Sequence, residues 1–252
     1  MIALETIAGS AAPGTLYGIG AGPGDVRHLT LRAAGLVASV DVLASFAKAG
    51  QTGHARTIVA PLVADGRLEL RLAYPVTTEV PVEQHGYARA IAAFYEESAT
   101  AIARHLAQGR SVGLLSEGDP FLYGSFMHMW RRLADTFPVE VVPGVTGMSG
   151  AWSRAGSPIA WGDDILSVLP ATLPEETLAR RLRDTDAAVI MKVGRHLAKI
   201  IRVARAAGVI DRAVLVERAT MPGERIRPLT ACEETHAPYF SMVLVPGRGR
   251  RL

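Results

Sequence analysis

The sequence predicts an α/β protein of two domains, an N-terminal parallel-sheet α/β domain followed by a C-terminal mixed-sheet α+β domain. In the first half of the chain, short apolar segments alternate with amphipathic helical segments, an order typical of parallel sheets. In the second half, five apolar segments have only two helical segments among them, so neighbouring strands there must pair antiparallel. We therefore expect domains at residues 1–147 and 148–252.

The N-terminal domain is expected to begin after a loose extension of about 13 residues, since domain edges carry such segments. The extension carries Glu5 and lacks a basic start, so it does not resemble a signal peptide. Asp119 and Pro120 suit the N-cap and first position of a helix, which predicts a helix starting there. The other elements follow from apolar periodicity: strands at 16–20, 40–44, 68–72, 111–115 and 139–142, and helices at 28–40 and 87–106.

The C-terminal domain is expected to end in a Gly/Arg-rich tail after its last strand. Its β-branched and apolar segments predict strands, and its two amphipathic segments predict helices. The strands are expected at 165–169, 188–193, 213–217, 226–229 and 242–245, and the helices at 175–183 and 195–207.

The cysteine count, the spacing of the histidines and the hydropathy pattern limit the classes to which the protein can belong. The single cysteine, Cys232, excludes a disulfide framework and favours a reducing, cytoplasmic location. Glu233 and Glu234 beside it disfavour a thiolate, so we expect an inert residue. The histidines are scattered, none at the H-x-x-x-H spacing, which predicts no metal site. No apolar run reaches about 18 residues, so no membrane span is expected.

The basic character of the chain comes from its C-terminal end. Three tail arginines, Arg248, Arg250 and Arg251, equal the formal net charge of +3. A nucleic-acid-binding domain usually carries a basic stripe within its fold, and this sequence shows none. We therefore expect no nucleic-acid partner.

A glycine-rich loop follows the first expected strand, at residues 18–25. A dinucleotide fingerprint fails in every register, because Pro23, Asp25 and Arg27 occupy the third glycine position, and no Gly-Lys-Ser/Thr follows. The loop is either a tight strand-to-helix turn or a ligand-binding loop. Three further loops follow strands, the edge where open parallel sheets bind ligands. Local capping by Asp119 or Thr146, and a Glu217–Arg218 ion pair, remain alternatives for them.

The four loops together resemble the tetrapyrrole (corrin/porphyrin) methyltransferase family, from about Thr15 to Gly247. The motifs stand in order at 17–25 with 29–30, 117–124, 141–146 and 216–220. Segments 123–127, 162–164, 169–174 and 191–195 are similar to the branch that methylates C20 of precorrin-2. The chain departs from the family where Val26 replaces the usual proline and where residues 45–53 lack the usual segment.

The resemblance implies a homodimer that binds S-adenosylmethionine in a cleft between the two domains and methylates precorrin-2 to precorrin-3A, for cobalamin biosynthesis. Arginines can hold the carboxylates of such a substrate. The motifs identify no catalytic residue and no acceptor for the C20 proton. The implied cofactor contacts are Pro23, Glu117, Gly118, Asp119, Leu122, Tyr123, Thr146, Gly147, Met191, Ala219 and Thr220. The implied substrate contacts are Gly20, Gly22, Asp25, Arg195 and Arg218. Arg27 and Arg71 are the next candidates for binding a substrate carboxylate if Arg195 and Arg218 do not bind one.

Other functions stay open at this point. Within the same fold, the alternatives are methylation at another precorrin position, of cobalt-precorrin-2, in diphthine synthesis, or of a ribosomal RNA ribose. A non-catalytic nucleotide-binding regulatory module is the alternative from another class. A nicotinamide oxidoreductase is disfavoured, because the glycine loop lacks the dinucleotide fingerprint.

Overall fold

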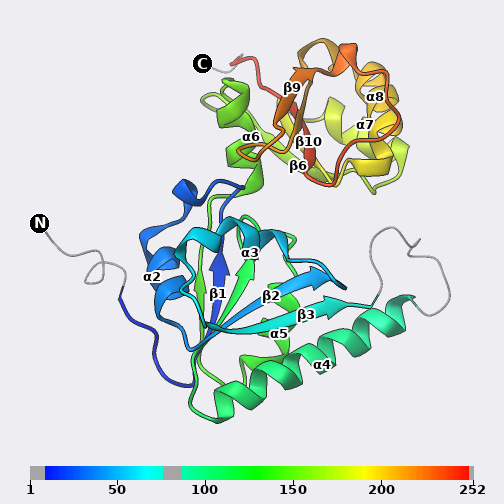
Figure 1. The fold of residues 1–252 in the computed structure, drawn as a ribbon. Helices are drawn as coiled ribbons and strands as arrows, with labels where there is room; N and C mark the ends of the chain where they lie inside the picture. Colours follow the sequence, from blue (N-terminus) through cyan, green and yellow to red (C-terminus); the bar gives the residue numbers. More distant parts are fainter. Residues whose placement is uncertain (1–8, 76–86, 250–252) are drawn as a thin grey trace, which may run out of the picture. The chain divides into compact units, whose positions relative to one another are not determined.

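The computed structural model describes residues 9–75 and 87–249. The chain divides into two compact units, Met1–Thr146 and Gly147–Leu252, and each is described by itself. Each unit contains one five-stranded sheet, and Figure 1 shows both sheets. The predicted fold class, a parallel-sheet half followed by a mixed-sheet half, is confirmed.

The first unit is built on a fully parallel sheet with strand order β3-β2-β4-β1-β5. Strand β1 lies between β4 and β5, pairing Leu16 with Val112 on one side and with Val139 on the other. The strands are β1 (Leu16–Gly20), β2 (Val42–Lys48), β3 (Leu68–Tyr74), β4 (Val112–Ser116) and β5 (Val139–Val142).

The chain leaves the adjacent strands β1 and β4 in opposite directions, toward β2 and toward β5. With right-handed connections, the helices that follow these strands lie on opposite faces of the sheet. Figure 1 shows α2 on one side of the sheet and α4 with α5 on the other. Such a reversal is where open α/β sheets bind ligands, outside the carboxyl ends of the strands.

The helices of the first unit bury one apolar face each. The α4–α5 side holds a core that includes Leu16, Leu114, Ile102 and Phe126, and Gly18 lacks the Cβ that would collide with the Phe126 ring. Burying a side chain of this size contributes about 1.5–3 kcal/mol. The helices are α2 (Leu31–Ser39), α3 (His54–Ile58), α4 (Tyr87–Ala107) and α5 (Phe126–Leu133), with short 3-10 turns η1 (Val26–His28) and η2 (Ala60–Leu62).

Two predicted starting points of helices in this unit were wrong. Thr30 caps α2, accepting the Ala33 amide at 3.1 Å, so the helix begins at Leu31 and only a 3-10 turn precedes it. No helix begins at Asp119 and Pro120, because α5 starts at Phe126 after an irregular turn. Tyr123 in that turn has a φ of +56°, which a right-handed helix cannot contain.

The second unit contains a mixed sheet with strand order β6-β7-β10-β8-β9. Strands β6 and β7 are parallel, and every other neighbouring pair is antiparallel. The direction of each strand therefore brings the carboxyl ends of β6, β7 and β8 to one edge. The strands are β6 (Leu166–Pro170), β7 (Ala187–Met191), β8 (Val214–Glu217), β9 (Arg225–Pro228) and β10 (Ser241–Val245).

Helices cover both faces of the second sheet. Leu178 and Leu182 of α7 pack with Ile200 of α8 in a core on one face, and Ala151 of α6 packs with Val216 on the other. The helices are α6 (Gly147–Ala155), α7 (Glu175–Arg183) and α8 (Leu197–Ala206), and the 3-10 turns are η3 (Gly194–His196), η4 (Ile210–Arg212) and η5 (Leu229–Ala231).

The described helices and the described polar side chains bear on two other classes of protein, membrane proteins and metal-binding proteins. None of the helices in residues 9–75 and 87–249 combines the length and the apolar character that crossing a membrane requires. Over the same ranges, no three His, Cys, Asp or Glu side chains gather as the ligands of a metal ion would.

Candidate active site

The loops that follow β1 and β4 are joined at the carboxyl edge of the first sheet. Gly22 and Gly118 form an antiparallel bridge, in which the Gly118 amide donates to the Gly22 carbonyl at 2.8 Å and the Gly22 amide donates back at 3.4 Å. Both residues have positive φ, +72° and +64°, a region that glycine enters without steric cost. Backbone hydrogen bonds therefore fix the two loops against each other.

The loop after β5 joins the same edge through direct contact between glycines. A Cβ on Gly20 would lie 2.5 Å from the Gly144 Cα and 2.7 Å from the Gly118 carbonyl oxygen. A Cβ on Gly144 would collide with that same oxygen and lie 2.9 Å from the Gly20 Cα. The three loops thus pack main chain on main chain, and the absence of side chains is a condition of their geometry.

The Asp119 carboxylate ties the second loop to the third. Its Oδ1 accepts the Phe121 amide at 2.8 Å, and its Oδ2 accepts the Gly144 amide at 3.1 Å. The prediction that Asp119 caps a helix is wrong, because α5 begins only at Phe126 and the second partner of Asp119 lies 25 residues away, in the loop after β5. Gly144 was not among the predicted contacts. It belongs to the Val-Val-Pro-Gly motif, and that motif was the feature of the sequence that could have identified it as a site residue.

Two predicted contacts at this edge, Glu117 and Asp25, use their carboxylates on nearby protein groups. Glu117 Oε1 accepts the Ala55 amide of α3 at 3.2 Å. Asp25 accepts the Arg27 amide at 2.9 Å and pairs with the Arg27 guanidinium at 2.6 Å. The side-chain hydrogen bond from Arg27 holds the pKa of Asp25 far below its ordinary value. Leu122 and Tyr123 lie in the same loop as Asp119, with Tyr123 exposed, while Pro23 is buried beside Gly22.

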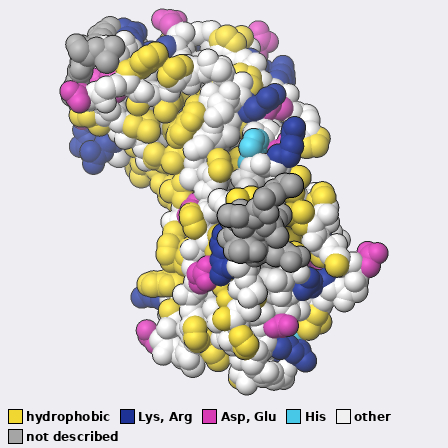
Figure 2. Space-filling model, turned by 90° about the vertical axis from the view of Figure 1, so that its left-hand side faces the viewer, with side chains coloured by type: hydrophobic (Ala, Val, Ile, Leu, Met, Phe, Trp, Pro, Cys, Tyr) yellow, Lys and Arg dark blue, Asp and Glu magenta, His cyan; other side chains and the backbone are white. Residues whose placement is uncertain are grey.

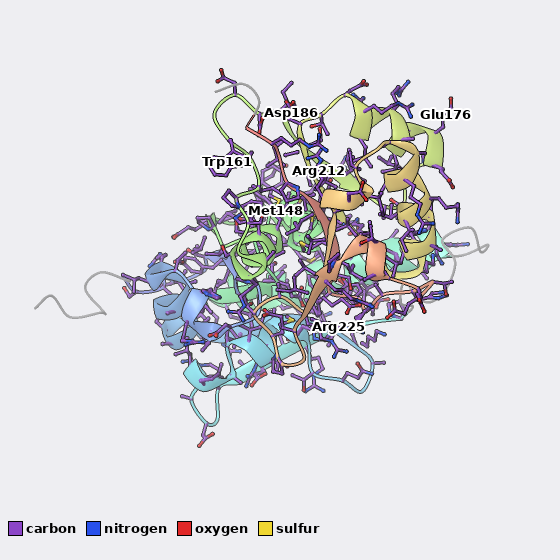
Figure 3. The ribbon with its side chains drawn as sticks, turned by 90° about the horizontal axis from the view of Figure 1, so that it is seen from above. Met148, Trp161, Glu176, Asp186, Arg212 and Arg225 are labelled. Carbon is purple, nitrogen blue, oxygen red and sulfur yellow. The ribbon has the colours of Figure 1, made fainter. Side chains whose placement is uncertain are left out.

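The second sheet has its own edge of candidate residues. Met191 ends β7, and Arg218, Ala219 and Thr220 follow β8, so their loops share the edge to which β6, β7 and β8 point. In Figure 3, Arg225 marks this end of the sheet, and Arg212 beside Asp186 marks the opposite end. Arg195 is exposed on η3, four residues after Met191 at the end of β7 and three residues after Lys192.

The loops of these two edges contain all four non-glycine residues with positive φ in the described chain. They are Tyr123, Lys192, Arg218 and Thr220, with φ between +50° and +62°. A non-glycine residue held in this region costs about 1–3 kcal/mol and is concentrated at ligand sites. Tyr123, Arg218 and Thr220 were predicted contacts on sequence motifs alone, so the backbone strain is an independent observation at the same positions.

Thr220 also has a side chain that the fold leaves unsatisfied. Its Oγ1 is buried and has no hydrogen-bond partner among the described residues. Its amide donates to Glu224 Oε2 at 2.7 Å. A buried hydroxyl without a partner costs about 1–3 kcal/mol, which makes it a place where a ligand can supply the missing bond.

The charged residues beside Thr220 are arranged differently from the Glu217–Arg218 ion pair considered from sequence. Glu217 is buried and lies 3.7 Å from Arg227 on the neighbouring strand β9. The Arg218 guanidinium folds back over its own turn, where a Cβ on Gly223 would lie 3.1 Å from its Nη1. Arg218 forms no ion pair within the described part of the chain.

Cys232, the only cysteine, is buried away from both edges, and its sulfhydryl faces the Pro228 carbonyl at 3.6 Å. Burial raises the pKa of its thiol, and Glu234 and Glu217 add to that shift. A thiol with a raised pKa is a poor nucleophile at neutral pH.

Comparison with known proteins places this geometry in a family. Residues 15–233 match the family model for tetrapyrrole (corrin/porphyrin) methylases. A precorrin-2 C(20)-methyltransferase of Sinorhizobium sp is 54% identical over 234 residues, 93% of this chain and 96% of that protein. A cobalt-precorrin-2 C(20)-methyltransferase of Salmonella typhimurium is 32% identical, over 92% and 96% of the two chains.

A solved structure shares the fold. Uroporphyrin-III C-methyltransferase from Thermus thermophilus, complexed with S-adenosyl homocysteine, has a TM-score of 0.62 with this chain at 23% identity. The match covers 91% of this chain and 96% of that one. The family model, the two relatives and the shared fold agree, and this chain belongs to the tetrapyrrole (corrin/porphyrin) methylase family.

Proposed function

We propose that this protein transfers a methyl group from S-adenosylmethionine to C20 of precorrin-2, giving precorrin-3A for cobalamin biosynthesis. The observation that carries the proposal is the 54% identity, over nearly the whole of both chains, to a precorrin-2 C(20)-methyltransferase. Cobalt-precorrin-2 is the second candidate substrate, on the 32% identity to an enzyme named for it.

Two features of the structure suit S-adenosylmethionine. The glycines of the first edge present main-chain groups with no side chains between them, so a ligand can approach the backbone closely. At the second edge, the buried Thr220 hydroxyl lacks a partner that a polar ligand atom can supply. The cofactor contributes an activated methyl group on a sulfonium, and the protein's task is to align it with the substrate carbon at about 3–3.5 Å.

We assign cofactor contact to residues of both loop groups, on the family motifs and on the strained backbone at Tyr123 and Thr220. Gly118 and Asp119 hold the first edge in shape, and Pro23 is buried there. The proposed contacts are Pro23, Glu117, Gly118, Asp119, Leu122, Tyr123, Thr146, Gly147, Met191, Ala219 and Thr220.

The carboxylates of the tetrapyrrole are assigned to local arginines rather than to the overall field of the protein. On the face shown in Figure 2, basic side chains are interspersed with acidic and apolar ones. Arg195 and Arg218 are both exposed, and the Arg218 guanidinium lies against Gly223. Gly20, Gly22 and Asp25 remain the other proposed substrate contacts.

The experiment that tests the function incubates the protein with labelled S-adenosylmethionine and either precorrin-2 or cobalt-precorrin-2. Mass spectrometry and NMR of the product then locate the new methyl group. A methyl group at C20 supports the proposal, and a methyl group at another carbon overturns it. Absence of label transfer with retained cofactor binding favours a non-catalytic nucleotide-binding module.

Steady-state kinetics separate the roles of the two arginines. Loss of a charge-assisted bond to a carboxylate costs about 1.5–3 kcal/mol, roughly a ten- to hundredfold rise in KM for the tetrapyrrole. Arg195→Ala and Arg218→Ala are each expected to show this rise, with the affinity for S-adenosylmethionine unchanged. An unchanged KM in both variants directs the search to Arg27 and Arg71.

A homodimer in the cytoplasm completes the proposal. The dimer rests on family resemblance, and the location rests on the single, buried Cys232. Light scattering over a dilution series is expected to give the mass of two chains, and a monomer mass at every concentration contradicts the dimer. Cell fractionation with an antibody tests the location.

A further inference from the structure

We infer that Glu224 and Arg154 are positioning residues, which hold the turn between β8 and β9 in the conformation that binds the cofactor. The turn comprises residues 218–224 and carries Arg218, Ala219 and Thr220. The inference rests on the proposed function for the identity of the ligand, while the geometry of the turn stands on its own.

The turn contains strained residues and is closed by backbone hydrogen bonds. Arg218 donates to the Phe240 carbonyl at 2.7 Å, Met221 donates to Arg218 at 2.9 Å, and Glu224 donates to Met221 at 3.2 Å. Arg218, Thr220 and Gly223 have φ of +50°, +62° and +78°. Only the glycine suits that region, so the two other residues need outside support to stay there.

Glu224 supplies that support at Thr220, and Arg154 supplies it to Glu224. The Glu224 carboxylate accepts the Thr220 amide at 2.7 Å. From α6, Arg154 donates its Nε and Nη2 to the same carboxylate at 2.7–2.9 Å. The hydrogen bonds from Arg154 hold the pKa of Glu224 below its ordinary value, so the acceptor is charged at neutral pH.

This arrangement orients Thr220 through its main chain and leaves the hydroxyl of its side chain available for another hydrogen bond. The carboxylate binds the main-chain amide, and the buried Thr220 hydroxyl is left without a partner among the described residues. Both Glu224 oxygens are already occupied by protein donors, so Glu224 acts through the turn and does not itself contact the ligand. Arg225, the next residue, marks this end of the sheet in Figure 3.

The test compares Glu224→Ala, Glu224→Gln and Arg154→Gln in the full-length protein. Glutamine retains an oxygen that can accept the Thr220 amide, whereas alanine does not. The dissociation constant for S-adenosyl homocysteine, measured by calorimetry, is expected to rise about tenfold or more in Glu224→Ala. Glu224→Gln is expected to recover most of that loss, and Arg154→Gln to lie between the two.

Hydrogen exchange of the Thr220 amide, followed by NMR without ligand, gives a second readout that is independent of the cofactor. Exchange is expected to accelerate at least tenfold in Glu224→Ala and much less in Glu224→Gln. In turnover, KM for S-adenosylmethionine is expected to rise in Glu224→Ala and to recover in Glu224→Gln. KM for precorrin-2 is expected to follow the same order, because Arg218 lies on the same turn. A purely structural ion pair changes neither constant.

The pair Arg202–Glu175, 2.9 Å apart on the helices α7 and α8, supplies the control. Glu175→Ala removes an ion pair from the same unit and is expected to change neither readout. Unchanged Thr220 exchange in Glu224→Ala, or equal loss of affinity in the alanine and glutamine variants, overturns the inference. If the wild-type protein fails to bind S-adenosyl homocysteine, the proposed function fails, and Thr220 exchange still decides whether Glu224 holds the turn.

Discussion

The loops at the carboxyl edges of the two sheets are held in shape by different means. At the first edge, Gly20, Gly118 and Gly144 pack main chain on main chain, and a Cβ on Gly20 would lie 2.5 Å from the backbone of Gly144. At the second edge, the loop contains non-glycine residues, Arg218 and Thr220, whose backbones are strained at positive φ. Hydrogen bonds support the loop in that conformation.

The difference lies in what each edge can tolerate. Backbone atoms that are already in contact cannot shift to make room for a side chain. One added carbon at the first edge should therefore cause a large loss in the free energy of unfolding. A strained loop held by side chains can relax when its support is removed, at a smaller energetic cost but with a change in ligand affinity. Substitutions at the first edge should therefore mainly lower the free energy of unfolding. Substitutions at the second edge should mainly change the affinity for the ligand.

Gly144→Ala is expected to have the largest effect on stability. The new Cβ would collide with the Gly118 carbonyl oxygen, and the loops after β4 and β5 would have to separate. We expect a loss of about 3 kcal/mol in the free energy of unfolding, the upper part of the range for overpacking. Urea denaturation followed by circular dichroism measures it.

Gly109→Ala is the matched control for that variant, because it separates steric contact from backbone conformation. Gly109 has a φ of +75° and open space around it, so alanine there bears only conformational strain of about 1–2 kcal/mol. Equal losses in the two variants would contradict the role assigned to contact between the loops.

Asp119→Ala is expected to have the next largest effect, because Asp119 is the side-chain link between glycine-built loops. Loss of the bonds to Phe121 and Gly144 should cost about 2 kcal/mol. Asp119→Asn has one acceptor oxygen for two amide donors, so we expect it to lie closer to alanine than to wild type. Wild-type stability in the asparagine variant would contradict the two-bond geometry.

Sequence periodicity predicted every strand of both sheets, because each strand carries its own apolar signal. It extended β2 only to Ala44, whereas the strand runs to Lys48, because Ser45 and Lys48 interrupt the apolar run. The Asp119–Pro120 pair misled for a related reason: it has the local form of a cap, while its carboxylate bonds to a distant loop. The contacts that decide the site are non-local, and local patterns do not record them.

The support of the second edge was equally hidden in the sequence. Positive φ at a glycine can be suspected from the residue type, but positive φ at Thr220 cannot, because threonine disfavours that region. Arg154 and Glu224 are separated by 70 residues and belong to no recognised motif. Only the family motifs drew attention to Ala219 and Thr220, and they drew none to the residues that hold them.

Thr220→Gly sharpens the comparison, because it should raise stability while lowering affinity. Glycine relieves the strain at φ +62° and removes the buried hydroxyl, although it increases the entropy of the unfolded chain. We expect a net gain of about 1 kcal/mol without ligand and weaker binding of S-adenosyl homocysteine. Thermal melts with and without ligand measure both, and a stability loss contradicts the strain at this position.

The smallest expected effect is the pH dependence that the Glu224–Arg154 pair gives to the second unit. Hydrogen bonds from Arg154 depress the pKa of Glu224 below its ordinary value of 4.5. A carboxyl with a depressed folded pKa contributes stability that is fully present above the ordinary value and is lost as pH falls through the folded pKa. Arg154 is 56% exposed, and solvent screening limits the contribution to about 0.5 kcal/mol.

Glu224→Gln should therefore unfold slightly more easily than wild type at pH 7, and the two should converge as the pH falls below about 4. Urea titrations at intervals between pH 3 and 7 measure the difference. A pH-independent deficit in Glu224→Gln would mean that the second edge, like the first, is held by geometry and owes nothing to the charge on Glu224.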